Sequence, residues 1–114
     1  MTMTNALLGN SLNVLAEEVF QIAKEHGWWE GQRNNGELIA LMHSELSEAL
    51  ENLRHGEPPS DHIPDFKGIE EEFADVIIRI LDMSHARGYR IGEAVLAKIE
   101  FNRNRPYKHG GKKF

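Results

Sequence analysis

Apolar residues recur every three to four positions in four separate segments of the chain, a period typical of α-helices that bury one face. The segments cover about residues 11–26, 34–54, 69–86 and 91–104. A glycine follows each of the first three within two residues, and Pro106 follows the fourth, so each segment ends where helices commonly stop. No run alternates apolar and polar residues as a half-buried strand would. The pattern therefore predicts an all-α protein built as a four-helix bundle.

The third segment is apolar over much more than one stripe. Its apolar side chains include Phe73, Val76, Ile77, Ile78, Ile80, Leu81 and Met83. Such breadth is typical of a helix that is buried on two sides, either at the centre of a bundle or at a contact between subunits. We therefore expect a homo-oligomer, either a homodimer or a homotetramer.

The length of 114 residues and the hydrophobic content of 40% fit a single helical domain over residues 1–114, large enough to bury a core. The sequence has no cysteine, so it has neither a disulfide nor a thiolate metal site, which suits a reducing compartment. We see neither a secretory signal pattern nor a run of about 18 apolar residues. The expectation is a cytoplasmic protein with no membrane partner.

Charge is distributed unevenly along the chain, whose net charge is −5. Residues 98–114 carry a net charge of +5, which leaves −10 on the other 97 residues. The basic C-terminal tail at residues 105–114 could bind nucleic acid, but the acidic remainder of the chain would repel a phosphate backbone. We favour a tail that folds back to bind phosphate beside a metal held by carboxylates, with no nucleic-acid partner.

Two pairs of carboxylates lie in the second and third helical segments. Glu45 and Glu48 form the first pair, and Glu72 and Asp75 form the second. The spacing places both acids of a pair on one helix face, so four carboxylates converge if the two helices pack antiparallel. Two like charges about 4 Å apart repel by roughly 4 kcal/mol at an effective dielectric near 20, which favours a bound hard cation such as Mg²⁺ or Mn²⁺. The alternatives are a solvated surface for each pair and an ion pair between Asp75 and Arg79.

Basic residues near the C-terminus are candidates for binding phosphate. Lys98, Asn102 and Arg105 share one face of the fourth helical segment, and His109 and Lys112 follow in the tail. We expect these five groups to contact phosphate oxygens and to neutralise their charge. A solvated helix face followed by a disordered tail is the alternative.

Two tryptophans, Trp28 and Trp29, lie in the connection between the first two helical segments. Tryptophan after a helix often covers the core, which is one interpretation of this pair. The other is an aromatic wall on which a nucleobase stacks.

Four motifs together resemble the MazG-like all-α nucleoside triphosphate pyrophosphohydrolases over about residues 29–112. They are Glu45-x-x-Glu48, Glu72-x-x-Asp75, Lys98-x-x-x-Asn102 and the stretch Arg105-Pro-Tyr-Lys-His-Gly-Gly-Lys112. The resemblance implies a magnesium-dependent helical oligomer that cleaves nucleoside triphosphates to the monophosphate and pyrophosphate. It also implies that the metal ligands are Glu45, Glu48, Glu72 and Asp75, and it favours Trp29 over Trp28 beside the base. Ser44 stands where many members carry another glutamate.

In such a mechanism Glu45 or Glu48 would take a proton from the attacking water, and Lys98 would offset the charge that develops on the leaving pyrophosphate. The expected role is the removal of unwanted nucleotides from the cellular pool. Two alternatives remain: a pyrophosphohydrolase that acts on phosphoribosyl-ATP, and a non-catalytic helical interaction or regulatory protein. The sequence has no Gly-x-x-x-x-Gly-Lys-Ser/Thr loop, which argues against a P-loop enzyme.

Overall fold

The computed structural model describes residues 3–106, and within this range the protein consists of four α-helices and no strand. The helices are α1 (Met3–Glu25), α2 (Asn35–Arg54), α3 (Gly68–Arg87) and α4 (Ile91–Arg103). The prediction of an all-α chain with four helices is therefore confirmed for the part that the structure describes. None of these helices has a stretch long and apolar enough to cross a membrane.

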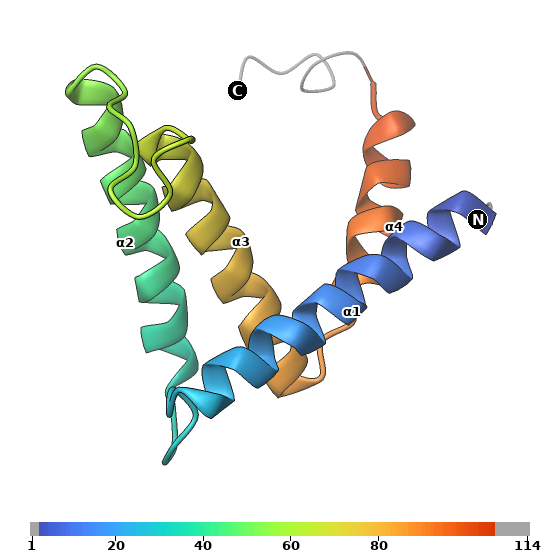
Figure 1. The fold of residues 1–114 in the computed structure, drawn as a ribbon. Helices are drawn as coiled ribbons and strands as arrows, with labels where there is room; N and C mark the ends of the chain where they lie inside the picture. The colour runs from blue at the N-terminus through green and yellow to red at the C-terminus, as the bar shows by residue number, and fades with distance from the viewer. Residues whose placement is uncertain (1–2, 107–114) are drawn as a thin grey trace.

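The helix α3 lies at the centre of the arrangement. It packs antiparallel to α2 on one side and is crossed by α1 on another, while α4 packs mainly against α1 (Figure 1). The result is open, because α4 stands apart from the α2–α3 pair (Figure 1). The radius of gyration is 16.7 Å, whereas about 13 Å is typical of a compact domain of this length. One copy of the chain is therefore more open than a compact domain of this length.

Local signals in the sequence explain where α2 and α3 begin and end. The side-chain oxygen of Asn34 accepts a hydrogen bond from the backbone N–H of Glu37 at 3.2 Å and so caps the N-terminus of α2. At the start of α3, Glu70 accepts a hydrogen bond from the backbone N–H of Lys67 at 3.0 Å. Gly88 ends α3 in the left-handed conformation, with φ of 73°, which glycine adopts at little cost.

The helix α1 begins at Met3, about two turns before the start that we expected at residue 11. Gly9 lies inside this longer α1, at the point where α1 crosses the start of α4. A Cβ atom on Gly92 would overlap the backbone carbonyl of Gly9, so the crossing needs glycine. Asn13 fixes the contact, because its side-chain oxygen accepts a hydrogen bond from Gly92 N at 2.9 Å.

The core of a single copy is small. Its buried apolar residues are Ala16, Leu38, Ala49, Leu81 and Met83. Large apolar side chains on α1 and α3 stay about half exposed, among them Ile22, Phe73 and Ile77. The predicted breadth of the apolar surface on α3 is thus present, but neither α1 nor α2 covers all of it. Apolar surface of this extent is typical of a protein that binds another macromolecule or a second copy.

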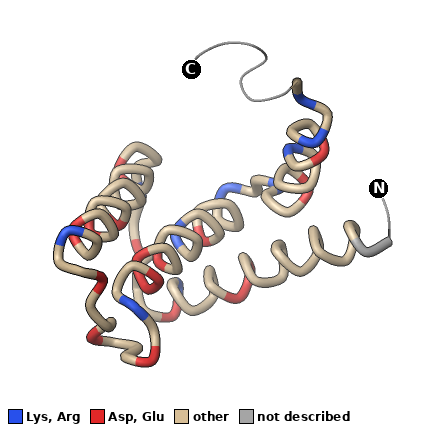
Figure 2. Tube along the Cα trace, turned by 90° about the horizontal axis from the view of Figure 1, so that it is seen from above, with Lys and Arg blue, Asp and Glu red and all other residues tan. Residues whose placement is uncertain are grey.

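Figure 2 shows how charge is distributed over these helices. Basic residues gather toward the C-terminal end of α4, where Lys98, Arg103 and Arg105 lie. Acidic residues predominate in the rest of the chain. The charge asymmetry of the sequence therefore becomes a separation in space, because α4 lies apart from the α2–α3 pair (Figure 1).

Candidate metal site

Three of the four predicted carboxylates converge between α2 and α3. One oxygen each of Glu45, Glu72 and Asp75 can be chosen so that all three lie within 4.8 Å of one another. The antiparallel packing of α2 and α3 produces this convergence, because each helix turns the same face toward its neighbour. Glu48, one turn after Glu45, is exposed and lies outside this group of three. It lines a hollow of about 290 Å³ together with Glu72, so it remains close to the cluster.

Glu72 is the most perturbed group of this cluster. Its Oε2 atom is buried and has no hydrogen-bond partner among the described residues. The pKa of Glu72 is raised to about 8, first by burial and then by the adjacent carboxyl groups of Glu45 and Glu48. At neutral pH and without a cation, Glu72 therefore holds a proton.

The pKa values of the other two carboxyl groups, Glu45 and Asp75, are shifted as well. Glu45 has a lowered pKa, because its carboxylate accepts a hydrogen bond from the protonated Glu72 and also contacts Arg79. The pKa of Asp75 is raised by burial and by the negative charge of Glu45. The protein thus accommodates these acids by retaining a proton, and a divalent cation would replace that proton.

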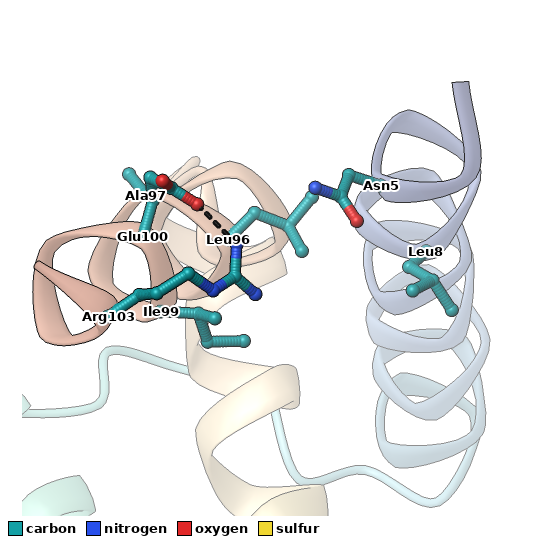
Figure 3. Close-up of a pocket in the computed structure, with 7 residues that line it drawn as sticks. All are labelled: Asn5, Leu8, Leu96, Ala97, Ile99, Glu100 and Arg103. Atoms are coloured by element: carbon teal, nitrogen blue, oxygen red, sulfur yellow. Dashed lines mark hydrogen bonds and ion pairs between the residues drawn. The ribbon is translucent and has the colours of Figure 1, made fainter. Parts of the chain in front are cut away.

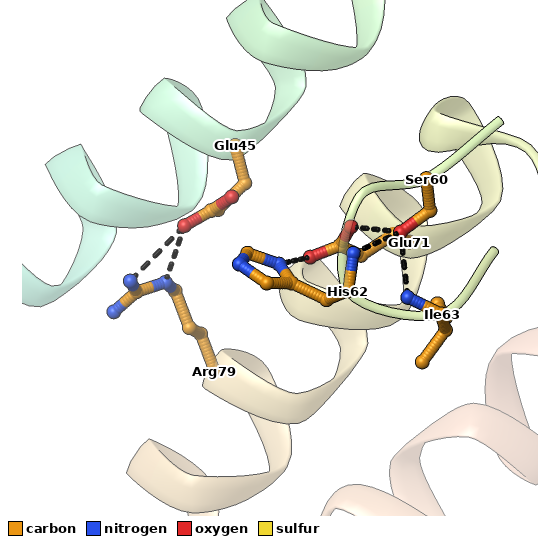
Figure 4. Close-up of polar contacts among 6 residues, drawn as sticks. All are labelled: Glu45, Ser60, His62, Ile63, Glu71 and Arg79. Atoms are coloured by element: carbon orange, nitrogen blue, oxygen red, sulfur yellow. Dashed lines mark hydrogen bonds and ion pairs between the residues drawn. The ribbon is translucent and has the colours of Figure 1, made fainter. Parts of the chain in front are cut away.

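Arg79 supplies positive charge at the edge of the cluster. Its Nε and Nη2 atoms donate hydrogen bonds to Oε1 of Glu45 at 3.2 and 3.0 Å (Figure 4). An ion pair between Asp75 and Arg79 was one interpretation of their spacing, but Arg79 reaches across to α2 instead. This contact orients Glu45 and compensates part of the negative charge.

The loop between α2 and α3 adds polar groups that the sequence motifs did not include. Glu71 accepts hydrogen bonds from Ser60 and His62 of this loop (Figure 4). These contacts lower the pKa of Glu71, with Ser60 as the larger cause. Both carboxylate oxygens of Glu71 are therefore occupied by loop residues, whereas Oε2 of the adjacent Glu72 has no hydrogen-bond partner among the described residues.

The two tryptophans occupy different environments. Trp29 is partly buried: its Nε1 donates a hydrogen bond to Asp82 at 2.8 Å, and the centre of its ring lies 5.8 Å from that of Phe20. The guanidinium carbons of Arg33 and Arg87 lie 5.0 and 5.5 Å from the same ring. These contacts make Trp29 a packing residue of the helix junction.

Trp28 is 58% exposed and lines two hollows of the surface. One, of about 390 Å³, is mostly apolar and is bordered by Val19 and Ile78. The other, of about 210 Å³, reaches Asp75 and Arg79 and therefore adjoins the carboxylate cluster. The structure thus places Trp28, and not the preferred Trp29, where a bound molecule could contact an aromatic face.

The predicted phosphate-binding residues lie elsewhere in a single copy. Lys98, Asn102 and Arg105 are exposed on and just after α4, which packs mainly against α1. The Nζ atom of Lys98 lies 4.4 Å from the ring centre of Phe101. His109 and Lys112 lie outside the described residues.

A larger hollow, of about 850 Å³, lies between α1 and α4 (Figure 3). Its lining includes Leu8, Leu96 and Ile99 together with an ion pair between Arg103 and Glu100, whose closest atoms are 2.6 Å apart. None of the predicted site residues lines it. Volume alone therefore does not identify the candidate site, whereas the perturbed carboxylates do.

Comparisons of the chain with models of protein families, with curated proteins and with solved structures gave no match. The class of protein that the geometry defines is thus an all-helical chain with a carboxylate cluster between two antiparallel helices.

Proposed function

We propose that the protein hydrolyses ribo- or deoxyribonucleoside triphosphates to the monophosphate and pyrophosphate in a magnesium-dependent reaction, with Mn²⁺ as a substitute. The observation that carries this proposal is the convergence of Glu45, Glu72 and Asp75, together with a buried Oε2 atom of Glu72 that has no hydrogen-bond partner in the described part of the chain. An all-oxygen donor set of this kind suits Mg²⁺. The motif resemblance to MazG-like pyrophosphohydrolases supplies the reaction, and removal of unwanted nucleotides is the role that we propose.

The residues have distinct tasks in this proposal. Glu45, Glu72 and Asp75 hold the cation, with Glu48 at its margin. A bound Mg²⁺ supplies charge stabilisation for phosphate oxygens and a more acidic water. Glu48 is exposed and is not held by Arg79, so it is the carboxylate best able to accept the proton of the attacking water. Arg79 keeps Glu45 in place.

A second copy of the chain completes the site in this proposal. Lys98, Asn102 and Arg105 of one copy would neutralise phosphate charge at the α2–α3 pair of another, in a homodimer or a homotetramer. The open arrangement of the helices and the half-exposed apolar side chains of α1 and α3 support such an assembly.

The base would contact Trp28. Its exposed ring borders the hollow that reaches Asp75, and the same hollow contains the polar side chains of Arg33 and Asp82. Arg33 can donate hydrogen bonds and Asp82 can accept them, so both are suited to the edge of a base. Trp29 supports this hollow from inside through its hydrogen bond to Asp82.

A screen of the eight common ribo- and deoxyribonucleoside triphosphates with Mg²⁺ tests the proposal, with products identified by ³¹P NMR. We expect pyrophosphate and a monophosphate from at least one substrate, and loss of this activity in Asp75→Asn. Formation of orthophosphate and a diphosphate would contradict the proposed reaction. Turnover of phosphoribosyl-ATP alone would favour the related pyrophosphohydrolase, and no turnover of any substrate would favour a non-catalytic protein.

A further inference from the structure

The loop at residues 55–67 carries a histidine to the edge of the carboxylate cluster. Nδ1 of His62 lies 2.6 Å from Oε2 of Glu71, and the hydroxyl of Ser60 donates a hydrogen bond to Oε1 of the same carboxylate. The Ser60 hydroxyl also accepts hydrogen bonds from the backbone N–H groups of His62 and Ile63, at 3.2 and 3.0 Å. Ser60, His62 and Glu71 therefore form one connected group, which we name the loop triad.

Two backbone hydrogen bonds hold the loop that carries Ser60 and His62. The backbone N–H of Ser60 donates to the carbonyl of Phe66 at 2.8 Å, and the N–H of Gly68 donates to the carbonyl of Pro58 at 2.8 Å. Ser60 is only 4% exposed. Because the backbone and the partner of Nδ1 are both fixed, the direction of the imidazole ring is fixed as well.

The other ring nitrogen of His62 points away from Glu71. In the view of Figure 4, Nε2 lies on the side of the imidazole that is turned toward the Glu45–Arg79 pair, and the charge of Asp75, a member of the cluster, acts on the ring. The side chain is 82% exposed, so Nε2 is accessible to a ligand. The pKa of His62 is raised, chiefly by its hydrogen bond with Glu71 and less by the charges of Asp61 and Asp75.

A polyphosphate at this site would need positive charge in addition to its cation. Arg79 already donates two hydrogen bonds to Glu45, and α4 packs mainly against α1 of its own copy. His62 adds to this edge of the cluster a donor at Nε2 when it is protonated, because Glu71 occupies Nδ1 alone.

We propose that His62 is a phosphate-binding residue of the candidate metal site. It donates Nε2–H to an oxygen of a di- or triphosphate whose cation is held by Glu45, Glu72 and Asp75, while Glu71 and Ser60 position the ring. This inference rests on the proposed function and adds a residue to it. The competing explanation is that the triad only fastens the loop to α3.

The first test uses the unmodified protein with ¹⁵N-labelled histidine, Mg²⁺ and imidodiphosphate, a pyrophosphate analogue that resists hydrolysis. We expect the Nε2 signal of His62 to shift on saturation while its Nδ1 signal changes little, because Glu71 already holds Nδ1. The signals of His43, exposed on α2, should not move. Saturable binding with an unchanged Nε2 signal would overturn the inference.

The second test compares His62→Ala with the matched control His43→Ala. Removing a charge-assisted hydrogen bond should weaken imidodiphosphate binding about 10- to 100-fold in the first variant and leave the control near the original affinity. A loop-fastening role alone would lower the melting temperature and leave the affinity within twofold of the original, which would overturn the inference.

The same experiments separate this inference from the proposed function. Binding of imidodiphosphate that depends on His62, without hydrolysis of any triphosphate, would contradict the hydrolase and leave the phosphate contact in place. Hydrolysis of a triphosphate by the original protein, combined with an unchanged affinity of His62→Ala for imidodiphosphate, would support the hydrolase and contradict the phosphate contact of His62. Failure of the original protein to bind imidodiphosphate at millimolar concentration with Mg²⁺ would overturn the phosphate contact directly.

Discussion

Replacing Glu72 with glutamine removes a carboxyl group whose pKa is strongly raised, and the glutamine side chain has nearly the same shape. Because the pKa of Glu72 in the folded protein is raised from 4.5 to about 8, the proton stabilises the fold at low pH. This contribution is fully present below pH 4.5 and is lost as pH rises through about 8. A glutamine side chain at this position cannot ionise, so the variant should not show this loss.

The size of the effect follows from the shift. A pKa raised from 4.5 to about 8 corresponds to at most about 5 kcal/mol between the two protonation states. Glu45 shares the proton and the cluster borders water, so we expect about 2 kcal/mol at pH 9, or a difference in melting temperature of about 8 °C.

Thermal unfolding followed by circular dichroism at pH 5, 7 and 9 in EDTA measures this effect. Glu72→Gln should match the original protein at pH 5 and exceed its melting temperature at pH 9, while Glu18→Gln on exposed α1 should track the original throughout. Addition of 10 mM Mg²⁺ at pH 9 should stabilise the original protein and not Glu72→Gln. A Glu72→Gln variant that is less stable than the original at every pH would refute the reasoning.

Three further predictions concern the assembly and the ligand contacts. Sedimentation at micromolar concentration should show a dimer or tetramer, and a single species of 13.0 kDa would contradict the proposed assembly. Trp28→Ala should raise KM severalfold with little change in melting temperature, whereas Trp29→Ala should cost about 3 kcal/mol of stability; equal effects on both quantities would contradict the different roles. Lys98→Ala should lower both kcat and kcat/KM if Lys98 acts on the leaving pyrophosphate, and truncation after Arg105 should lower activity as well. Full activity with unchanged KM in the truncated protein would remove the tail from the site.

The helices were predictable because their signals are local. The cap at Asn34 and the stop at Gly88 each act within a few residues, and both lie where the sequence places them. The start of α1 was not predictable, because the first turns of α1 contact Gly92 at the start of α4, which is far away in sequence. The open position of α4 likewise depends on tertiary contacts that periodicity does not report.

The candidate site was likewise predictable only in part from the sequence. Equal spacing within two helices predicted that four carboxylates, Glu45, Glu48, Glu72 and Asp75, converge if the helices pack antiparallel. The structure groups three of them and leaves Glu48 beside the group. The contributions of Arg79 and His62 could not be predicted, because Arg79 pairs with a residue on another helix and His62 depends on the path of a loop. The preference for Trp29 over Trp28 came from the family resemblance, and the part-buried hydrogen bond of Trp29 to Asp82 is a tertiary contact that the sequence does not report.

Calorimetric titration with Mg²⁺ tests the central claim, the metal site between α2 and α3, most directly. The original protein should bind Mg²⁺ with saturation, and Asp75→Asn should weaken that binding at least tenfold, since one of three converging carboxylates loses its charge. Asp65→Asn, the same change at an exposed position of the loop, should leave the affinity unchanged. Equal Mg²⁺ affinity in all three proteins, or no saturable binding to the original protein, would contradict the site.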